Sequence, residues 1–203
     1  AAVAPAGAVT ARYVLSLGGD GSRTNVGFYF DGATLICLSP EVTSVYNGGF
    51  EEGMDENTGL PKGYDVWEWT DSAKGTVELT KEKAYKGQYS AKLSTSKGTG
   101  QNSIRSGLVA VEPNVSYNFN TYTYALSGSN PVVRAHFYTK DGADLGIKDY
   151  TPVVSGAWVR SSVTMVAPSN AAFASVMIYQ NRQSDAVAYV DEISIVKTAD
   201  DHP

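Results

Sequence analysis

Residues 115–125 read VSYNFNTYTYA and residues 132–139 read VVRAHFYT. In both stretches, apolar and polar residues alternate with a period of two, which is the pattern of a β-strand that buries one face. The positions expected to face the core are Val115, Tyr117, Phe119 and Thr121 in the first stretch and Val133, Ala135 and Phe137 in the second. The opposite faces carry aromatic rings, amides, a guanidinium and an imidazole. The alternation therefore separates a face that packs in the core from an outward face with aromatic and hydrogen-bonding side chains.

Similar stretches occur along the rest of the chain. They are residues 76–81, 89–94, 159–166, 174–180 and 187–196, all rich in Val, Ile, Thr and Tyr. Turn residues separate them, as in Pro113-Asn114, Lys140-Asp141-Gly142 and Pro168-Ser169-Asn170. No segment sustains a period of 3.6. The pattern predicts an all-β fold, a two-sheet antiparallel β-sandwich of the jelly-roll type.

An internal repeat indicates how the chain is organised. Residues 3–17 (VAPAGAVTARYVLSL) parallel residues 166–180 (VAPSNAAFASVMIYQ), and residues 29–36 (YFDGATLI) parallel residues 189–196 (YVDEISIV). We therefore interpret residues 1–37 as the C-terminal strand remnant of a preceding similar module. The remaining assignments are a linker at 38–45, one complete module at 46–197 and a tail at 198–203. The alternative is that residues 1–45 add strands to the same domain.

The remnant also bears on the oligomeric state. Two strands are not stable alone, so they are expected to pack on the complete module or to pair with another chain. We expect a monomer, with a swapped dimer left open.

Composition excludes several function classes. The net charge is −5 and no Lys/Arg cluster appears, which argues against nucleic acid as a partner. No apolar run approaches the roughly 18 residues of a membrane span, so no membrane is expected as a partner. Cys37 is the only cysteine, which rules out an intrachain disulfide and a multi-cysteine metal site.

An ordered set of short motifs marks the complete module. Residues 47–52 read NGGFEE, residues 61–64 read PKGY, and residues 84–90 read AYKGQYS. Residues 111–117 fit Val-x-Pro-x-x-x-Tyr, residues 137–142 read FYTKDG, and residues 189–195 read YVDEISI. In this order the motifs resemble the β-jelly-roll carbohydrate-binding modules of families 4, 9, 16 and 22, which have a galactose-binding-like topology. The resemblance extends from residue 47 to residue 195.

The resemblance implies a non-catalytic module that targets a secreted polysaccharide-degrading enzyme to its glycan. The other domains of that parent enzyme, a glycoside hydrolase or polysaccharide lyase, would be further partners, and the location would be bacterial and extracellular or at the cell surface. A β-linked glucan or mannan is the first choice of ligand, because the net charge of −5 disfavours a polyanion. Arg105, Arg134 and Arg182 leave an acidic glycan open.

The same resemblance implies a structural calcium ion. It places the first strand, the Lys86–Gly87 turn and the last strand close together. Glu51 or Glu52, backbone carbonyls near Lys86, and Asp191 would then supply the hard oxygen ligands that Ca²⁺ prefers. The alternative is that these carboxylates are merely solvated at strand ends.

The candidate sugar-binding residues come from the outward positions of the two opening stretches. These are Asn120, Tyr122 and Tyr124 in the first and Arg134, His136 and Tyr138 in the second. Sugars present apolar C–H patches and a rim of hydroxyls, which suit aromatic rings flanked by planar hydrogen-bonding groups. We expect the two strands to be neighbours and to form one concave groove. The alternative is an ordinary polar outer face.

Further candidates lie outside those strands. Trp67 and Trp69 would share one face of an extended segment, about 7 Å apart. Gln101 and Gln180 are weaker candidates that rest on the likeness to family 16 modules. Trp158 matches a buried tryptophan of the family and is expected in the core.

Two other functions compete with sugar binding. No Ser-His-Asp order, HExxH, P-loop or GxGxxG motif is convincing, so we do not expect an enzyme. The best catalytic alternative is a jelly-roll lyase that uses Arg134, His136 and Tyr138. The other alternative is a structural or adhesive spacer with no glycan partner.

Overall fold

The computed structural model describes residues 45–66, 76–97, 102–151, 156–180 and 185–198. The chain divides into two units, Ala1–Cys37 and Leu38–Pro203, and every described residue belongs to the second. Residues 1–37 lie outside the described residues, so their interpretation as a strand remnant of a preceding module stays a prediction.

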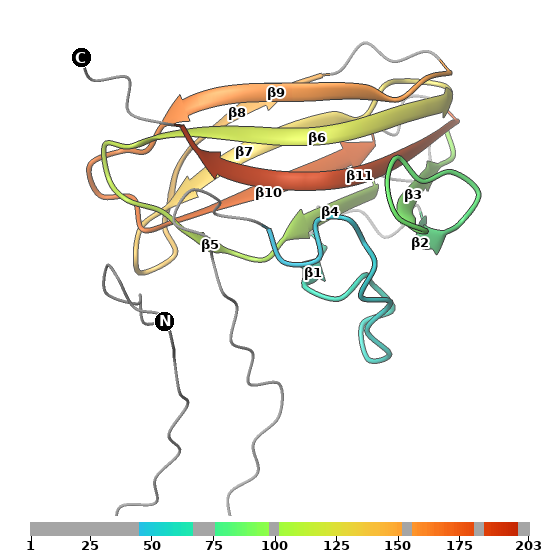
Figure 1. The fold of residues 1–203 in the computed structure, drawn as a ribbon, viewed down its shortest axis with the longest axis horizontal. Helices are drawn as coiled ribbons and strands as arrows, with labels where there is room; N and C mark the ends of the chain where they lie inside the picture. Colours follow the sequence, from blue (N-terminus) through green and yellow to red (C-terminus); the bar gives the residue numbers. More distant parts are fainter. Residues whose placement is uncertain (1–44, 67–75, 98–101, 152–155, 181–184, 199–203) are drawn as a thin grey trace, which may run out of the picture. The chain divides into compact units, whose positions relative to one another are not determined.

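The described residues form two antiparallel sheets, which confirms the predicted β-sandwich (Figure 1). The first sheet has the order β1 (Tyr64–Asp65), β4 (Asn102–Ser106), β10 (Phe173–Gln180), β7 (Val132–Tyr138) and β8 (Asp144–Tyr150), and β5 (Val109–Ala110) also pairs with β10. The second has the order β2 (Thr76–Thr80), β3 (Ser90–Thr95), β11 (Ala186–Lys197), β6 (Ser116–Ser127) and β9 (Val159–Val166). In the described part of the chain, no helix is long and apolar enough to cross a membrane.

Aromatic rings from both sheets meet in the core. Phe119 of β6 contacts Phe137 of β7 edge to face, with ring centroids 5.4 Å apart, and Tyr117 contacts the same ring at 6.5 Å. The odd-numbered positions predicted to point inward are buried on both strands, and Val115 just before β6 is partly buried against the same core. Burial of each large apolar side chain among them, such as Phe119, Val133 or Phe137, contributes about 1.5–3 kcal/mol, so this interface is a main source of stability.

The first residues of the module lie against its last strand, β11, and their backbones are in direct contact. The Ile193 N–H donates to the Gly48 carbonyl over 2.9 Å. Phe50, two residues further along the chain, is fully buried and stacks on Tyr64 with ring centroids 5.0 Å apart. A Cβ at position 48 would overlap the carbonyl oxygen of Ile193, so glycine is the residue that permits this contact.

Replacing Gly48 by Ala should therefore loosen the pairing of the opening segment with β11. We expect Gly48→Ala to lower the free energy of unfolding by about 2 kcal/mol in urea denaturation. Gly107→Ala is the matched control, because a Cβ there would meet only the Gly63 carbonyl oxygen, at 3.3 Å. Equal stability of the two variants would contradict this account.

Candidate functional site

The predicted sugar-binding residues lie on opposite outer faces of the sandwich. β6 and β7 follow each other in sequence but belong to different sheets, so their outward side chains point away from each other. The expectation of one shared groove is wrong. The cause is a crossover between the sheets, which alternation along a strand does not reveal.

The outer face of the first sheet is named here the arginine face. Its outward positions follow from the strand register, which aligns Asp65 with Arg105, Arg105 with Met177, Met177 with Arg134 and Arg134 with Asp149. The residues of this face used below are Asp65, Arg105, Arg134, His136, Tyr138, Asp149, Ser175 and Tyr179.

Both arginines of the arginine face are held by two-pronged ion pairs. Arg105 donates to the two carboxylate oxygens of Asp65 over 2.9 and 2.6 Å, and Arg134 donates to those of Asp149 over 2.5 and 2.8 Å. The hydrogen bond from Arg134 holds the pKa of Asp149 below its usual value. The Arg134 guanidinium also lies over the Tyr179 ring, 5.2 Å from its centroid. Each arginine is thus fixed in place and electrically balanced.

His136 and Tyr138 belong to the arginine face but are buried beneath its surface. Their rings stack at 5.6 Å, and they are 1% and 5% exposed. His136 Nδ1 lies 3.3 Å from Asp144, and the Tyr138 hydroxyl lies 3.2 Å from that of Ser175. The alternation predicted their outward direction correctly, but it could not show that neighbouring side chains bury them.

The outer face of the second sheet carries a cluster of rings, named here the tyrosine face. Tyr85, from the loop before β3, stacks on Tyr122 of β6 with centroids 3.7 Å apart and planes 15° from parallel. Trp158 meets Tyr85 and Tyr124 edge-on at 6.0 and 5.8 Å, and Tyr189 meets Tyr124 at 6.0 Å. Trp158 is half-buried in this outer cluster, whereas the sequence placed it in the core.

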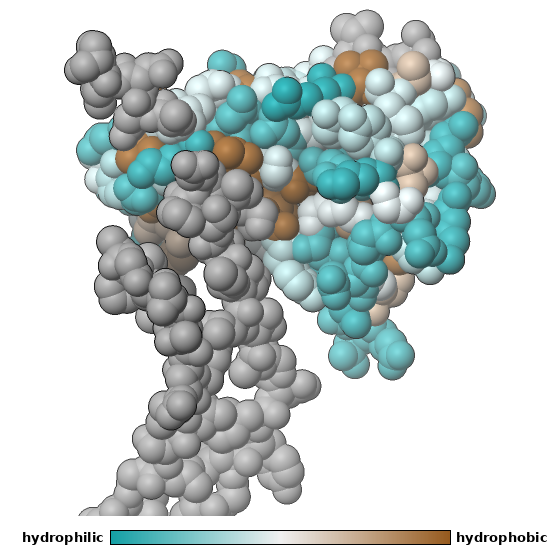
Figure 2. Space-filling model, in the orientation of Figure 1, coloured by the Kyte–Doolittle hydropathy of each residue, from teal (hydrophilic) through white to brown (hydrophobic). Residues whose placement is uncertain are grey.

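Polar groups continue the tyrosine face along β6 and β9. Arg160 donates to Asn120 Oδ1 over 2.6 Å, and Ser162 donates to Asn118 Oδ1 over 2.7 Å. Asn120 is only 7% exposed, while Arg160 and Ser162 are exposed. Figure 2 shows this side of the molecule as mostly teal and white, with brown confined to patches.

The remaining candidates divide into one buried residue and three without a described position. Gln180 is fully buried and donates through Nε2 to the Ser129 carbonyl over 2.5 Å, so it stabilises a loop and presents no surface to a ligand. Trp67, Trp69 and Gln101 lie outside the described residues.

Two of the predicted calcium ligands do converge on one turn. Asp191 is fully buried, and its Oδ2 accepts hydrogen bonds from the backbone N–H groups of Tyr85 and Lys86 over 2.8 and 3.1 Å. Glu51 Oε1 accepts from Gln88 and Tyr89 over 2.7 and 2.8 Å. The two acids therefore bracket residues 85–89.

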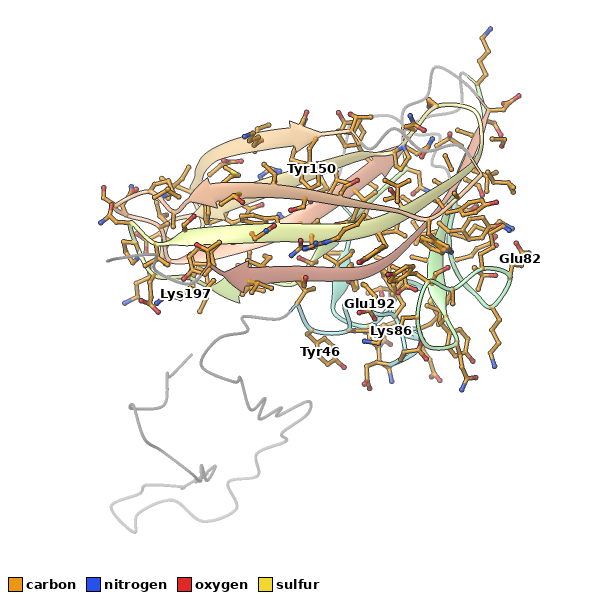
Figure 3. The ribbon with its side chains drawn as sticks, turned by 45° about the horizontal axis from the view of Figure 1, so that its top comes forward. Tyr46, Glu82, Lys86, Tyr150, Glu192 and Lys197 are labelled. Carbon is orange, nitrogen blue, oxygen red and sulfur yellow. The ribbon has the colours of Figure 1, made fainter. Side chains whose placement is uncertain are left out.

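The charge around Asp191 is only partly balanced. Burial raises the pKa of Asp191 to about 6, against the opposing effect of its backbone hydrogen bonds. Glu192 lies beside it, and the Lys86 ammonium pairs with Glu192 at 3.4 Å (Figure 3). Glu52 is exposed, and only its backbone N–H makes a hydrogen bond in this region, to Asn47.

Sequence reasoning missed several groups that complete these faces. Asp65 and Asp149 neutralise the arginines, Tyr179 supplies a ring, and Tyr85 and Arg160 extend the tyrosine face. Alternation along 174–180 could have placed Tyr179 outward. The acid–base pairs depend on strand order and register, which no local pattern in the sequence encodes.

Comparisons with known proteins agree on the fold and the family. A family model described as a carbohydrate binding domain matches residues 42–185. The solved structure of the family 16 carbohydrate binding module-2 shares 23% identity, has a TM-score of 0.54, and is matched over 74% of this chain and 96% of its own length. No curated protein matches.

Two larger proteins contain a similar domain. The enzymatically active domain of tailspike protein 4 from Bacteriophage CBA120 has a TM-score of 0.65 at 13% identity, over 77% of this chain and 22% of its own length. The arabinose-bound MgGH51 α-L-arabinofuranosidase has a TM-score of 0.57 at 12% identity, over 77% of this chain and 26% of its own. The chain thus spans about a quarter of each of these proteins, and the likeness shows a shared fold.

The buried imidazole of the arginine face should make stability depend on pH. Burial lowers the pKa of His136 although Asp144 opposes the shift, and Arg134 and Arg105 add to the lowering. Because the folded pKa lies below the unfolded one, the stability present above about pH 6.5 is lost as the pH falls towards the folded pKa. Melting temperatures from pH 7.5 to 5 should decline in the wild type and decline less in His136→Gln. Parallel profiles would contradict a buried, neutral His136.

Proposed function

The chain belongs to the carbohydrate-binding domain family, and from this premise we propose that its arginine face binds a neutral polysaccharide, a β-linked glucan or mannan. The observation that carries the proposal is the arrangement of Tyr179, Arg134 and Asp149. It combines a half-buried ring with an oriented guanidinium and a carboxylate on one face of a sheet. Sugar C–H patches suit the ring, and hydroxyls suit the two charged groups.

The ion pairs favour a neutral ligand over an acidic one. Each guanidinium already binds an aspartate carboxylate in the bidentate geometry that the carboxylate of a uronic acid would need. An anionic sugar would have to displace Asp65 or Asp149 and leave that carboxylate unpaired. A neutral chain can instead accept hydrogen bonds from the Arg134 N–H groups that do not bind Asp149, and the ion pairs then stay intact.

We further propose that the module acts without catalysis and holds a larger enzyme on its glycan. A lyase mechanism requires a base that reaches the substrate. The His136 side chain is only 2% exposed, which argues against that role. The similar domains that form about a quarter of the tailspike protein and the arabinofuranosidase support an accessory domain within a longer chain. Extracellular location is part of the same proposal.

Affinity electrophoresis and calorimetry against a panel of glucans, mannans and uronic-acid polymers should test the ligand. We expect retardation by a neutral polymer, and a loss of about tenfold or more in affinity, or about 1.4 kcal/mol, in Tyr179→Ala and Arg134→Ala. Lys140→Ala, an exposed turn residue, is the matched control. No binding to any glycan would favour a spacer, and cleavage of a uronic-acid polymer would favour a lyase.

We also propose a structural calcium ion beside the turn of residues 85–89. The chemistry of the donors supports it, because Asp191 and Glu51 are hard carboxylates on either side of the turn, and the charge of buried Asp191 is only partly balanced. Backbone carbonyls near Lys86 would complete the ligand set. The described residues contain no cluster of three acidic, His or Cys side chains suited to a metal, so such carbonyls would be required. Bound calcium would pin the opening segment to β11.

Calcium should therefore raise the melting temperature, because an ion that binds only the folded state stabilises it. Adding CaCl₂ after removal of metals should stabilise the wild type and Glu52→Ala, but not Glu51→Ala, in scanning calorimetry. Glu51→Ala should also cost about 1–2 kcal/mol without calcium, since two backbone N–H groups lose their acceptor. An unchanged melting temperature in the wild type would remove the calcium proposal.

A further inference from the structure

We infer that the tyrosine face is a second glycan-binding site, so that one module holds two glycan chains on opposite sides. This inference rests on the proposed function, because it extends carbohydrate binding to a second surface. The two faces belong to different sheets and point in opposite directions, so occupation of one leaves the other open.

The first observation is an exposed ring on a rigid support. Tyr85 is 44% exposed, although its ring stacks on Tyr122 at 3.7 Å. Its backbone N–H donates to the buried Asp191 carboxylate over 2.8 Å. An exposed aromatic ring that is fixed from below loses little conformational entropy when a sugar stacks on it.

The second observation is an exposed, oriented arginine next to the stacked rings. Arg160 is aligned with Tyr122 in the strand register and donates one N–H to Asn120 over 2.6 Å. Within the described part of the chain, Arg160 makes no ion pair, in contrast to Arg105 and Arg134. Its remaining donors are available for the oxygens of a sugar.

The third observation is a row of small polar groups that continues from the rings. Ser162 donates to Asn118 as described above, and Asn120 Nδ2 lies 3.4 Å from both the Asn118 carbonyl oxygen and the Ser194 hydroxyl, to which it donates. From Tyr122 to Asn118 the row extends about 13 Å, at about 3.3 Å per residue. An aromatic platform that leads into a row of amides and hydroxyls fits a saccharide better than it fits an apolar partner protein.

The stoichiometry of binding tests this inference directly. Calorimetry with hexasaccharides of β-linked glucose and of β-linked mannose should give two sites per wild-type chain for the sugar that binds, and one site in Tyr85→Ala and in Arg160→Gln. Tyr85→Phe keeps the stacking ring and should keep both sites. Melting temperatures should verify that each variant is folded.

A bridging assay gives a second readout. The wild-type monomer should agglutinate polysaccharide-coated beads, because two sites on one molecule join two surfaces. Tyr85→Ala should bind the beads without agglutinating them. Agglutination that persists in the double variant Tyr85→Ala/Arg160→Gln would overturn the second site and point to self-association.

The outcomes separate this inference from the proposed function. A single wild-type site that Tyr179→Ala abolishes would overturn the second site and leave the proposed function intact. Binding that survives Tyr179→Ala but is lost in Tyr85→Ala would overturn the arginine-face proposal and support the tyrosine face as a site. No binding of either hexasaccharide or of any polymer in the panel would overturn both.

Discussion

The packing of β6 against β7 through the core is the constraint on which both outer faces depend. Phe119 and Tyr117 meet Phe137 between the two sheets, so these strands must turn their aromatic and aliphatic sets towards each other. Their polar sets are then forced outward on opposite sides. Two outer surfaces that both combine rings with polar groups thus arise from one buried interface.

A second constraint acts at the end of the sandwich where the opening segment meets β11. Asp191 and Glu51 accept four backbone N–H groups from the turn of residues 85–89. The buried carboxylate of Asp191 would be costly without such partners, and Glu51 holds the other side of the turn, so the turn has few alternative positions. This rigidity reaches the surface directly, because Tyr85, the most exposed ring of the tyrosine face, belongs to that turn.

The sequence allowed the fold and the inward positions to be predicted, but not the joint geometry of the site. Period-two alternation placed Phe119 and Phe137 in the core and Tyr122 and Arg134 outside, because those assignments need only one strand at a time. Whether Tyr122 and Arg134 share a face depends on which sheet receives each strand, and this is decided by crossovers. Burial of His136 and Gln180 likewise depends on neighbours that are distant in sequence. The ordered motifs succeeded for the family because they mark turns and strand ends, which are local.

The two faces differ electrostatically because their arginines have different partners. On the arginine face, the carboxylates of Asp65 and Asp149 balance the positive charges of Arg105 and Arg134, and the geometry of each ion pair is fixed before a ligand arrives. On the tyrosine face, Arg160 is held by a neutral amide and keeps its charge. Solvent and salt screen an exposed charge of this kind, so it contributes more to orienting a sugar hydroxyl than to attracting one over a distance. The two faces therefore differ in how they meet a polar ligand, one with paired charges and one with the exposed guanidinium of Arg160.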